Sequence, residues 1–505
     1  MEKIDLRTFH KRSDAVRLGQ IVYMPQAPTE HDFSGAYDVL MQRLDRLPRD
    51  MAKRIVLYKF PFVARSVIMD AARDAAWPSA DKPTWFDCLP DAFRREAERE
   101  WATHVVEDPN ILLGFDFVGL GGYAVDLDAS GLIGAAFHCF NLSRLIRIRQ
   151  LAWLTTPVLP QDRPGVIPFR FDHNRLNHVW DVAALANLLA HGLGLSESDT
   201  ATLVLAAATH DARTPAGGDT TKLLDREYFD EDKNYPELLE KFDSAKMLAY
   251  FGIDRDALVQ TVLGKGLLGR LLDLADKTGY LARDAFWFHM RYRMEIHECD
   301  EGNAVHDLLN RHPDACSAWQ NASLVDGRLV FTDAESLALM LKLRALLFRA
   351  LYWHPASRFT EFIVSHLILR HLYDSGQVNK RDLLAWGDDE LDQLVQRYGT
   401  LGFGDNYGEP LHEGFEDQAE AEHRREELID QGEVCVMLET LPVRIKSGTD
   451  FLVMTAGGPQ PLHLAEPDLA APVDALARTA NRYRLYWVPR ETIPHGILQL
   501  LLSRK

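Results

Sequence analysis

The longest regular pattern in the chain is helical and extends from about residue 130 to 385. Five segments carry it: 141–154, 177–195, 198–211, 265–289 and 336–354. In each of them apolar residues return at spacings of three and four, which places them on one face of an α-helix. Such faces must be buried against one another, so the sequence predicts a mainly α protein with a helical core.

The segments on either side of this core differ from it in pattern. At 505 residues the chain is long enough for about three domains. Four short segments have the composition of strands: 54–60, 433–438, 450–455 and 483–488. We therefore expect an N-terminal α/β extension of unknown role over 1–125, the helical core over 126–390, and an acidic linker with a small C-terminal α/β or β subdomain over 391–505.

Composition excludes several classes of partner. The 56 basic and 74 acidic residues give a formal charge of −18, which disfavours double-stranded DNA as a partner. The five cysteines are far apart and form no C-x-x-C motif, so they indicate a reducing compartment and neither a disulfide framework nor a zinc ribbon. The most apolar stretch, 111–125, is too short to span a membrane and contains Asp116. We expect a cytoplasmic protein without a membrane partner.

The most informative short segment is LVLAAATHD, residues 203–211. Ser196 and Asp199 form a capping pattern that predicts the start of this helix, and the apolar run predicts that its end is buried. The helix therefore brings His210 and Asp211 to the edge of a core. A buried carboxylate without a partner costs several kcal/mol, so Asp211 needs a cation or a hydrogen-bond network.

Two neighbouring helices offer the remaining ligands of a metal site. His178 lies in segment 177–195, and Asp276 lies on a helix face that it shares with Asp273, Lys277, Tyr280, Arg283 and Asp284. The predicted metal ligands are His178, His210, Asp211 and Asp276. This mixed set of nitrogen and oxygen ligands suits a divalent ion such as Mn, Mg, Fe, Zn, Ni or Co. The alternative is that His178 is a hydrogen-bonded core histidine and that Asp276 pairs with Lys277 or Arg283.

These positions also occur in the order of a known family pattern. The pattern here is Arg175-x-x-His178, His210-Asp211 and Asp276. It resembles the HD-domain phosphohydrolases. The segments RLIRIRQL (144–151), DKTGYLARDA (276–285) and LRALLFRALYWH (343–354) resemble more narrowly the deoxynucleoside triphosphate triphosphohydrolases of the SAM-and-HD-domain and bacterial dGTPase type. The resemblance covers about residues 140–390 and implies an HD-domain core.

The resemblance implies a role for each matching residue. It implies the same four metal ligands, and the following substrate contacts: Gln150 and Leu151 at sugar and base, Arg175, Lys277 and Arg344 on phosphates, and Tyr280 and Asp284 at the deoxyribose. The implied reaction is metal-dependent hydrolysis of a deoxynucleoside triphosphate (dNTP) to deoxynucleoside and triphosphate. Metal, Arg and Lys would stabilise the charge that develops on the α-phosphate. We also expect an oligomer of identical chains.

The loop after His210-Asp211 departs from the family pattern. Family members usually end this loop in a catalytic His, whereas this chain has Asp219. A carboxylate can still shuttle a proton, with its pKa set by the metal and by Lys222, so the expected catalytic residues are Asp219, Lys222 and Arg175. Asp219 as an additional metal ligand or as a turn cap stays open. Arg213 is either a phosphate ligand or a loop charge.

Two other functions fit the same residues. One is a different HD-type reaction on a phosphate ester, as in a nucleotidase or a phosphodiesterase. The other is a nucleotide-binding regulator that has lost turnover together with the usual His.

Overall fold

The computed structural model describes two main stretches of the chain, 132–151 and 174–502. Within the second, short gaps fall at 243, 295–299, 313–314, 396, 398–409, 435, 440–445, 447, 481–482 and 494. Of the first 131 residues it describes the three short strands β1 (Lys3–Asp5), β2 (Ile21–Tyr23) and β3 (Tyr123–Ala124). β2 pairs in parallel with β1 and antiparallel with β3. The strand expected at 54–60 lies outside the described residues.

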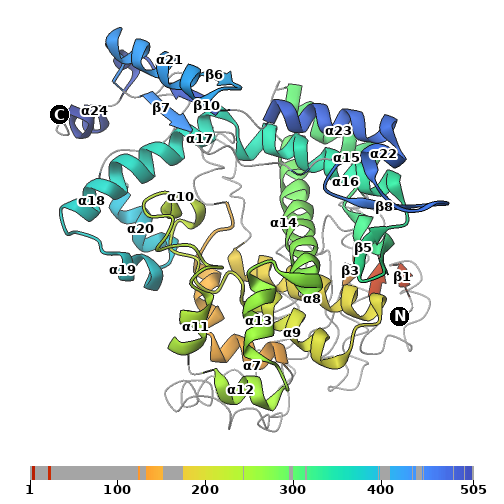
Figure 1. Cartoon of the computed structure of the whole chain (residues 1–505). Helices are drawn as coiled ribbons and strands as arrows, with labels where there is room; N and C mark the ends of the chain where they lie inside the picture. The colour runs from red at the N-terminus through yellow and green to blue at the C-terminus, as the bar shows by residue number, and fades with distance from the viewer. Residues whose placement is uncertain are drawn as a thin grey trace.

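The centre of the molecule is a group of packed helices (Figure 1). They are α7 (Leu132–Cys139), α8 (Arg175–Leu193), α9 (Glu197–Thr209), α13 (Arg255–Val262) and α14 (Gly266–Met294). The short helices α10 (Gly218–Lys222), α11 (Tyr235–Lys241) and α12 (Ala245–Tyr250) connect α9 to α13. The prediction of a mainly α protein is confirmed.

Local sequence signals set the ends of α8 and α9 and the distance between α8 and α14. Asn174 caps α8 by accepting a hydrogen bond from the Asn177 amide. Ser196 caps α9 through the Asp199 amide, as predicted. A Cβ added at Gly279 would lie 3.2 Å from Val182 Cγ2, so this glycine permits the close approach of α14 to α8.

A second set of helices follows in the chain. α15 (Asp300–Arg311) and η4 (Ser317–Asn321) precede α16 (Ala334–Leu347), which continues as the π-helix η5 (Phe348–Tyr352). Next come α17 (Pro355–Phe362), the π-helix η6 (Ile363–Leu369), α18 (Arg370–Asp374), α19 (Lys380–Ala385) and α20 (Asp388–Val395). The described helix over 334–347 and its π-helical extension account for the helix predicted over 336–354.

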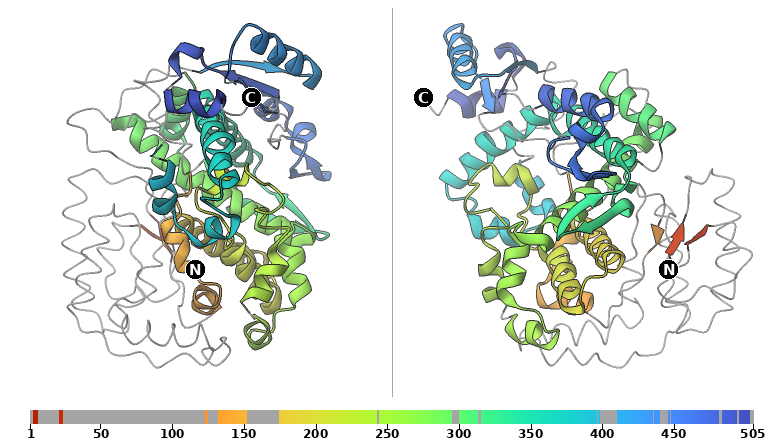
Figure 2. Two further views of the ribbon diagram at one scale, coloured as in Figure 1. Left: turned by 90° about the vertical axis from the view of Figure 1, so that its left-hand side faces the viewer. Right: turned by 45° about the vertical axis from the view of Figure 1, so that its right-hand side comes forward.

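Two small sheets contain the C-terminal strands. In the order β4-β5-β8-β9, the first sheet joins β4 (Ala322–Val325) and β5 (Arg328–Phe331) to β8 (Leu452–Thr455) and β9 (Gly458–Pro461). The second has the antiparallel order β6-β10-β7, from β6 (Leu411–Phe415), β10 (Tyr483–Trp487) and β7 (Val436–Glu439). It lies at the opposite side of the molecule from β1 and β3 (Figures 1 and 2). The predicted small C-terminal strands are therefore present.

Helices of the C-terminal part accompany these sheets. They are α21 (Gln418–Asp430), α22 (Leu462–Ala465), α23 (Pro467–Ala480), η8 (Arg490–Thr492) and α24 (His495–Leu502). Val453, Leu462, Ala470 and Val473 are buried in the same apolar cluster as the residues of α8, α9 and α14. The C-terminal part thus contributes to the main core. The boundary predicted near residue 390 stays a prediction.

One predicted helix is largely absent from its described part. Of residues 141–151, which the structure describes, only Leu142–Arg147 is helical, as the 3-10 helix η2, and residues 152–154 of the prediction lie outside the described residues. Arg149 then forms a β-bridge with Asn174. Its guanidinium pairs with Asp388 at 3.0 Å and with Asp392 at 2.7 Å, and these distant contacts favour an extended backbone over another helical turn.

Among the described residues, no helix combines the length and the apolar composition that a membrane span requires.

Candidate metal centre

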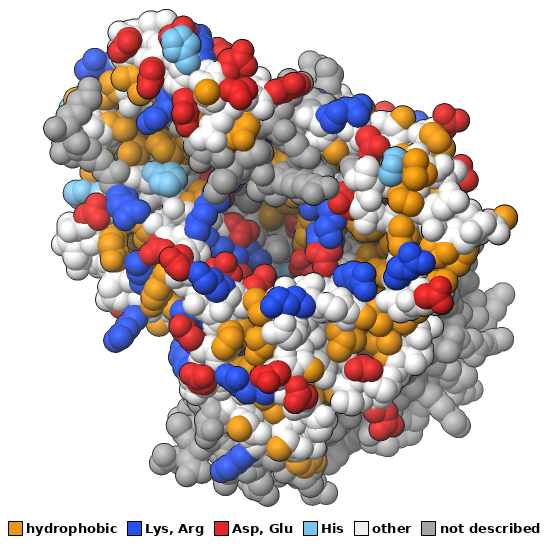
Figure 3. Space-filling view, viewed as in Figure 1, with side chains coloured by type: hydrophobic (Ala, Val, Ile, Leu, Met, Phe, Trp, Pro, Cys, Tyr) orange, Lys and Arg blue, Asp and Glu red, His pale blue; other side chains and the backbone are white. Residues whose placement is uncertain are grey.

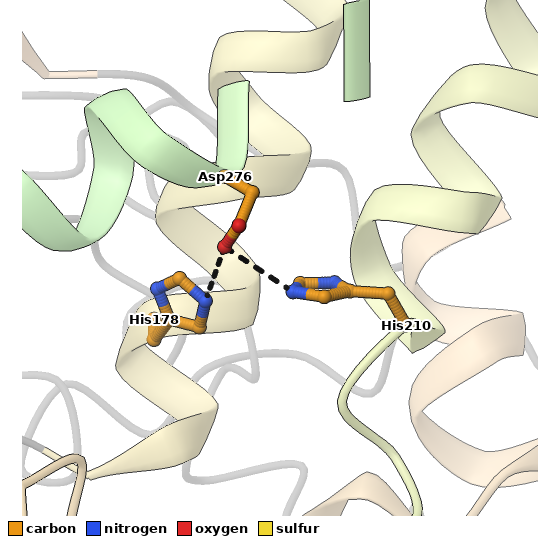
Figure 4. A group of neighbouring side chains, drawn as sticks. All are labelled: His178, His210 and Asp276. Atoms are coloured by element: carbon orange, nitrogen blue, oxygen red, sulfur yellow. Dashed lines mark ion pairs between the residues drawn. The ribbon is translucent and has the colours of Figure 1, made fainter. Parts of the chain in front are cut away.

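Three helices bring two histidines and an aspartate together. His178 is in the first turns of α8, His210 is the C-cap of α9, and Asp276 is in α14. One ligand atom from each lies within 4.8 Å of the others. Asp276 Oδ1 is 3.1 Å from His178 Nε2 and 3.6 Å from His210 Nε2, so it points between the two rings (Figure 4).

Asp211 joins this group from the residue after His210. Its Oδ2 atom is 3.6 Å from His178 Nε2, and its Oδ1 atom is 3.8 Å from His210 Nε2. Arg175 Nη1 donates to Asp211 at 2.8 Å and orients the carboxylate. The structure thus places all four predicted metal ligands around one point.

The ion pairs of α14 test the alternative that Asp276 pairs with Lys277 or Arg283. Lys277 pairs with Asp273, and Arg283 pairs with Asp181. Neither cation is the partner of Asp276, whose carboxylate faces the two histidines instead.

The hydrogen bonds of the histidines leave ring nitrogens available for a metal. His210 Nδ1 lies 2.8 Å from the Ala207 carbonyl, so the tautomer that donates there presents a lone pair at Nε2. Among the described residues, buried His210 Nε2 has no hydrogen-bond partner, and His178 presents its Nε2 to Asp276 Oδ1 at 3.1 Å. Ligand atoms about 2.1 Å from one ion are about 3 Å apart, which the spacing of the cluster approaches. The residues fit a divalent cation.

Electrostatics in the cluster favour a positive charge. Burial lowers the pKa of His210, but Asp211 and Asp276 outweigh this effect and raise the pKa to about 10. Burial raises the pKa of Asp211, but His210 and Arg175 hold it well below its usual range. Asp276 is likewise held low, by His178 and His210, against the effect of burial. Two ionised carboxylates beside two imidazoles are the environment in which a bound cation is stabilised.

The loop after Asp211 turns back toward Arg175. Gly217 has φ +79° and Gly218 has φ +53°, both in the left-handed region that favours glycine. The turn brings Asp219 Oδ2 to 3.2 Å from Arg175 Nη2 and Asp219 Oδ1 to 2.9 Å from Lys222 Nζ. The Asp219 side chain is exposed, and Lys222 and Arg175 lower its pKa to about 2. The carboxylate is therefore ionised while both cations contact it.

Two residues near the centre were not predicted. Glu231 is buried, accepts a hydrogen bond from Thr214 Oγ1 and pairs with Lys222 Nζ at 2.7 Å. Burial raises the pKa of Glu231 to about 7. Lys446 Nζ lies 2.7 Å from Asp273 Oδ2, although 173 residues separate the two in sequence. No local spacing could reveal either contact.

The residues assigned to the sugar form a second group, on α14 and α16. Tyr280 OH accepts a hydrogen bond from Arg344 Nε at 2.8 Å. The ring of Tyr280 packs edge to face on Tyr352, 6.2 Å between centroids, and Tyr352 OH donates to Asp284 Oδ2. These contacts fix the orientation of the Tyr280 ring.

The remaining predicted residues are more scattered. Lys277 pairs with Asp273, and burial together with Lys446 lowers the pKa of Lys277 to about 6. Gln150 and Leu151 are buried. Arg213 pairs with Glu237 at 3.3 Å, whereas Arg175 is the arginine that contacts the metal ligands.

The surface is hollowed beside this centre. Figure 3 shows the hollow between α10 and α14, with Lys and Arg side chains and Asp and Glu side chains gathered around it. Both signs of charge at the rim suit a substrate that carries phosphates together with a bound cation.

Known proteins resemble this chain in structure but not detectably in sequence. No family model and no curated protein matches the sequence. A hypothetical protein from Aquifex aeolicus superposes with a TM-score of 0.50 and 16% identity, over 75% of this chain and 97% of its own. A phosphohydrolase from Bacteroides thetaiotaomicron superposes with a TM-score of 0.48 and 15% identity, over 70% of this chain and 94% of its own. At 16% identity the likeness to the first of these proteins is one of fold alone.

Proposed function

We propose that the chain is a metal-dependent phosphohydrolase that converts dNTPs into deoxynucleoside and triphosphate. The observation that carries the proposal is the convergence of His178, His210 and Asp276 from three helices, with buried His210 Nε2 left without a hydrogen-bond partner among the described residues. Asp211 supplies a second carboxylate at this point. Nitrogen and oxygen ligands of this kind suit the divalent ions that serve phosphoryl transfer.

The proposed reaction breaks one bond at the α-phosphorus. Water attacks this atom, the bond to the 5′ oxygen breaks, and the leaving oxygen takes a proton. A divalent cation, when bound, supplies positive charge at the phosphate and lowers the pKa of the attacking water. Arg175 and Lys222 lie beside the metal ligands and are positioned to hold phosphate oxygens as negative charge develops.

Asp219 is the proposed proton carrier. In the structure Arg175 and Lys222 hold its pKa at about 2, at which it is a weak base. A triphosphate would compete for both cations. Release of the carboxylate would bring its pKa closer to the ordinary value of about 4 and allow it to move a proton.

The sugar preference is proposed to depend on Tyr280. The Tyr280 hydroxyl and ring are fixed by Arg344 and Tyr352, so the ring is a rigid wall. A rigid aromatic ring under the sugar leaves no room for a 2′-hydroxyl. Deoxynucleotides are therefore the proposed substrates, with the base preference undetermined by these contacts.

Product analysis tests the proposal directly. Purified protein is incubated with each dNTP and with Mn²⁺, Mg²⁺ or Co²⁺, and the products are separated by ion-exchange chromatography. The proposal expects equal amounts of deoxynucleoside and inorganic triphosphate. Release of orthophosphate or pyrophosphate would point instead to a different phosphate-ester hydrolysis on the same site.

A second candidate function follows from the ion pairs that Asp219 forms with Arg175 and Lys222. If its pairs with Arg175 and Lys222 persist when a nucleotide binds, the site has a metal and phosphate ligands but no available proton carrier. The chain would then bind nucleotides as a regulator. Saturable dNTP binding without any product over hours would favour this function over the enzymatic one.

A further inference from the structure

A pocket of about 490 Å³ lies between η2, α11 and α19. Its wall includes Ala212 and Arg213 from the loop after the metal ligands, but none of the four metal ligands lines it. This volume lies in the range of small-molecule sites. Of the residues that line it, Arg213 is the one given a possible substrate contact above, as one of two alternatives.

The lining of the pocket is strongly basic. Four basic side chains and one acidic side chain line it: Arg144, Arg213, Lys241, Arg381 and Glu237. The chain as a whole has a net charge of −18, so this positively charged cluster is opposite in sign to the rest of the protein. Such a local excess attracts anions.

Three of the cations retain unused binding capacity. Lys241 and Arg381 have no acidic partner among the described residues. Arg213 pairs with Glu237 through Nη2, but its Nη1 is buried and has no hydrogen-bond partner in the described part of the chain. A buried guanidinium N–H without a partner is costly and is an available donor for a ligand oxygen.

Arg144 has a different role in the same wall. Its guanidinium donates to the carbonyl oxygens of Ala212, Thr214 and Trp386, so it holds the loop and leaves its charge uncompensated. Burial, followed by repulsion from Arg144 and Arg213, lowers the pKa of Lys241. An anion in the pocket would relieve this repulsion.

Three aromatic residues belong to the lining, and we call them the aromatic base of the pocket. Phe140 and Phe242 line it and pack edge to face, 5.9 Å between centroids. Tyr228 also lines it, with Arg213 Cζ 5.5 Å from the centre of its ring. The pocket therefore combines phosphate-binding cations with a surface for a flat or apolar group.

We propose that this pocket is a second ligand site, which binds a small phosphate ester carrying an aromatic ring. The phosphate would contact Arg213, Lys241 and Arg381, and the ring would pack on the aromatic base. The proposal does not depend on the function proposed above, because no metal ligand takes part.

The test is a titration in EDTA, in which metal-dependent turnover is absent. Phenyl phosphate, glycerol 3-phosphate and inorganic phosphate are titrated into the full chain by calorimetry. We expect phenyl phosphate to bind at least tenfold more tightly than either of the other two. The double variant Lys241→Gln/Arg381→Gln should weaken phenyl phosphate binding at least tenfold.

A matched control removes the same charge from the surface nearby. Lys246→Gln/Arg255→Gln alters two exposed cations on α12 and α13 that do not line the pocket. This control should bind phenyl phosphate as the unaltered chain does. Absence of binding to the unaltered chain, or equal affinity in the two double variants, would overturn the proposal. Equal affinity for the three probes would overturn the role of the aromatic base.

Discussion

Two clusters of charged side chains lie next to each other between helices α8 and α14. They differ in the residues that balance the negative charge of their carboxylates. Asp181 on α8 and Arg283 on α14 form a buried pair through two hydrogen bonds, Nε to Oδ2 at 2.5 Å and Nη2 to Oδ1 at 2.7 Å. One turn earlier on α8 and two turns earlier on α14, His178 and Asp276 also face each other. They are joined by Asp211 and His210, and among the described residues no arginine or lysine pairs with Asp276.

The difference distinguishes a structural pair from a candidate site. In the Asp181–Arg283 pair the opposite charges compensate each other within the chain. In the cluster around Asp276, Arg175 pairs with Asp211, whereas Asp276 faces only the imidazoles of His178 and His210 among the described residues. Burial and charge alone therefore do not mark a site, whereas a carboxylate that faces imidazole nitrogens in place of a permanent cation does. The following predictions test this contrast.

The largest effect is expected for Asp211→Ala. Loss of this carboxylate should remove bound metal and lower dNTP hydrolysis by at least about a thousandfold, because cation chemistry supplies several kcal/mol to phosphoryl transfer. Circular dichroism should show the helical content unchanged. Asp256→Ala, an exposed aspartate on α13, is the control and should keep full activity. Full metal occupancy in Asp211→Ala would refute its assignment as a ligand.

Arg283→Leu should have the opposite effect: it should lower the stability of the fold and leave metal binding unchanged. It leaves Asp181 buried without its partner, and breaking a buried ion pair in this way costs about 3–5 kcal/mol. The unfolding midpoint in urea should fall, while metal content per folded chain stays the same. Asp181→Leu/Arg283→Leu should recover much of the stability. Loss of metal at unchanged stability would show that the pair belongs to the site.

Asp219→Asn tests whether the carboxylate next to the cluster carries a proton or binds the metal. The amide keeps the shape but cannot carry the proton, so turnover should fall by about 10²–10⁴-fold with metal content unchanged. Turnover close to that of the unaltered chain from pH 6 to 9 would leave Asp219 as a loop residue. A loss of metal would make it a ligand instead.

The smallest effect concerns the sugar. A fixed Tyr280 ring should make dATP hydrolysis about a hundredfold faster than ATP hydrolysis. Tyr280→Ala should reduce this ratio, mainly by accelerating ATP hydrolysis. Equal kcat/KM for dATP and ATP in the unaltered chain would exclude the proposed role of the ring.

Local periodicity predicted the elements that carry the metal ligands. α8, α9 and α14 have long apolar repeats, and Ser196 gave the start of α9 correctly. Because these helices must pack on one another, residues at their buried ends could be paired from sequence. The position of His210 at the end of an apolar helix was the strongest signal.

The other contacts in and around the site join residues that are distant in sequence, so the spacing of residues along the chain does not reveal them. Arg149 is extended because Asp388 and Asp392 draw its side chain away from a helical turn. Glu231 and Lys446 reach the site through the tertiary fold, from a connecting segment and from the C-terminal part. Sequence periodicity reports which face of an element is buried, but it does not report such distant polar partners.

Metal binding by paired aspartate variants tests the central claim most directly. Equilibrium dialysis against Mn²⁺ compares the unaltered chain with Asp276→Asn and with Asp273→Asn, one turn away on the same helix. The account predicts stoichiometric binding by the unaltered chain and by Asp273→Asn, and none by Asp276→Asn. Equal binding by Asp276→Asn and the unaltered chain, with both folded, would contradict the assignment of the cluster as a metal centre.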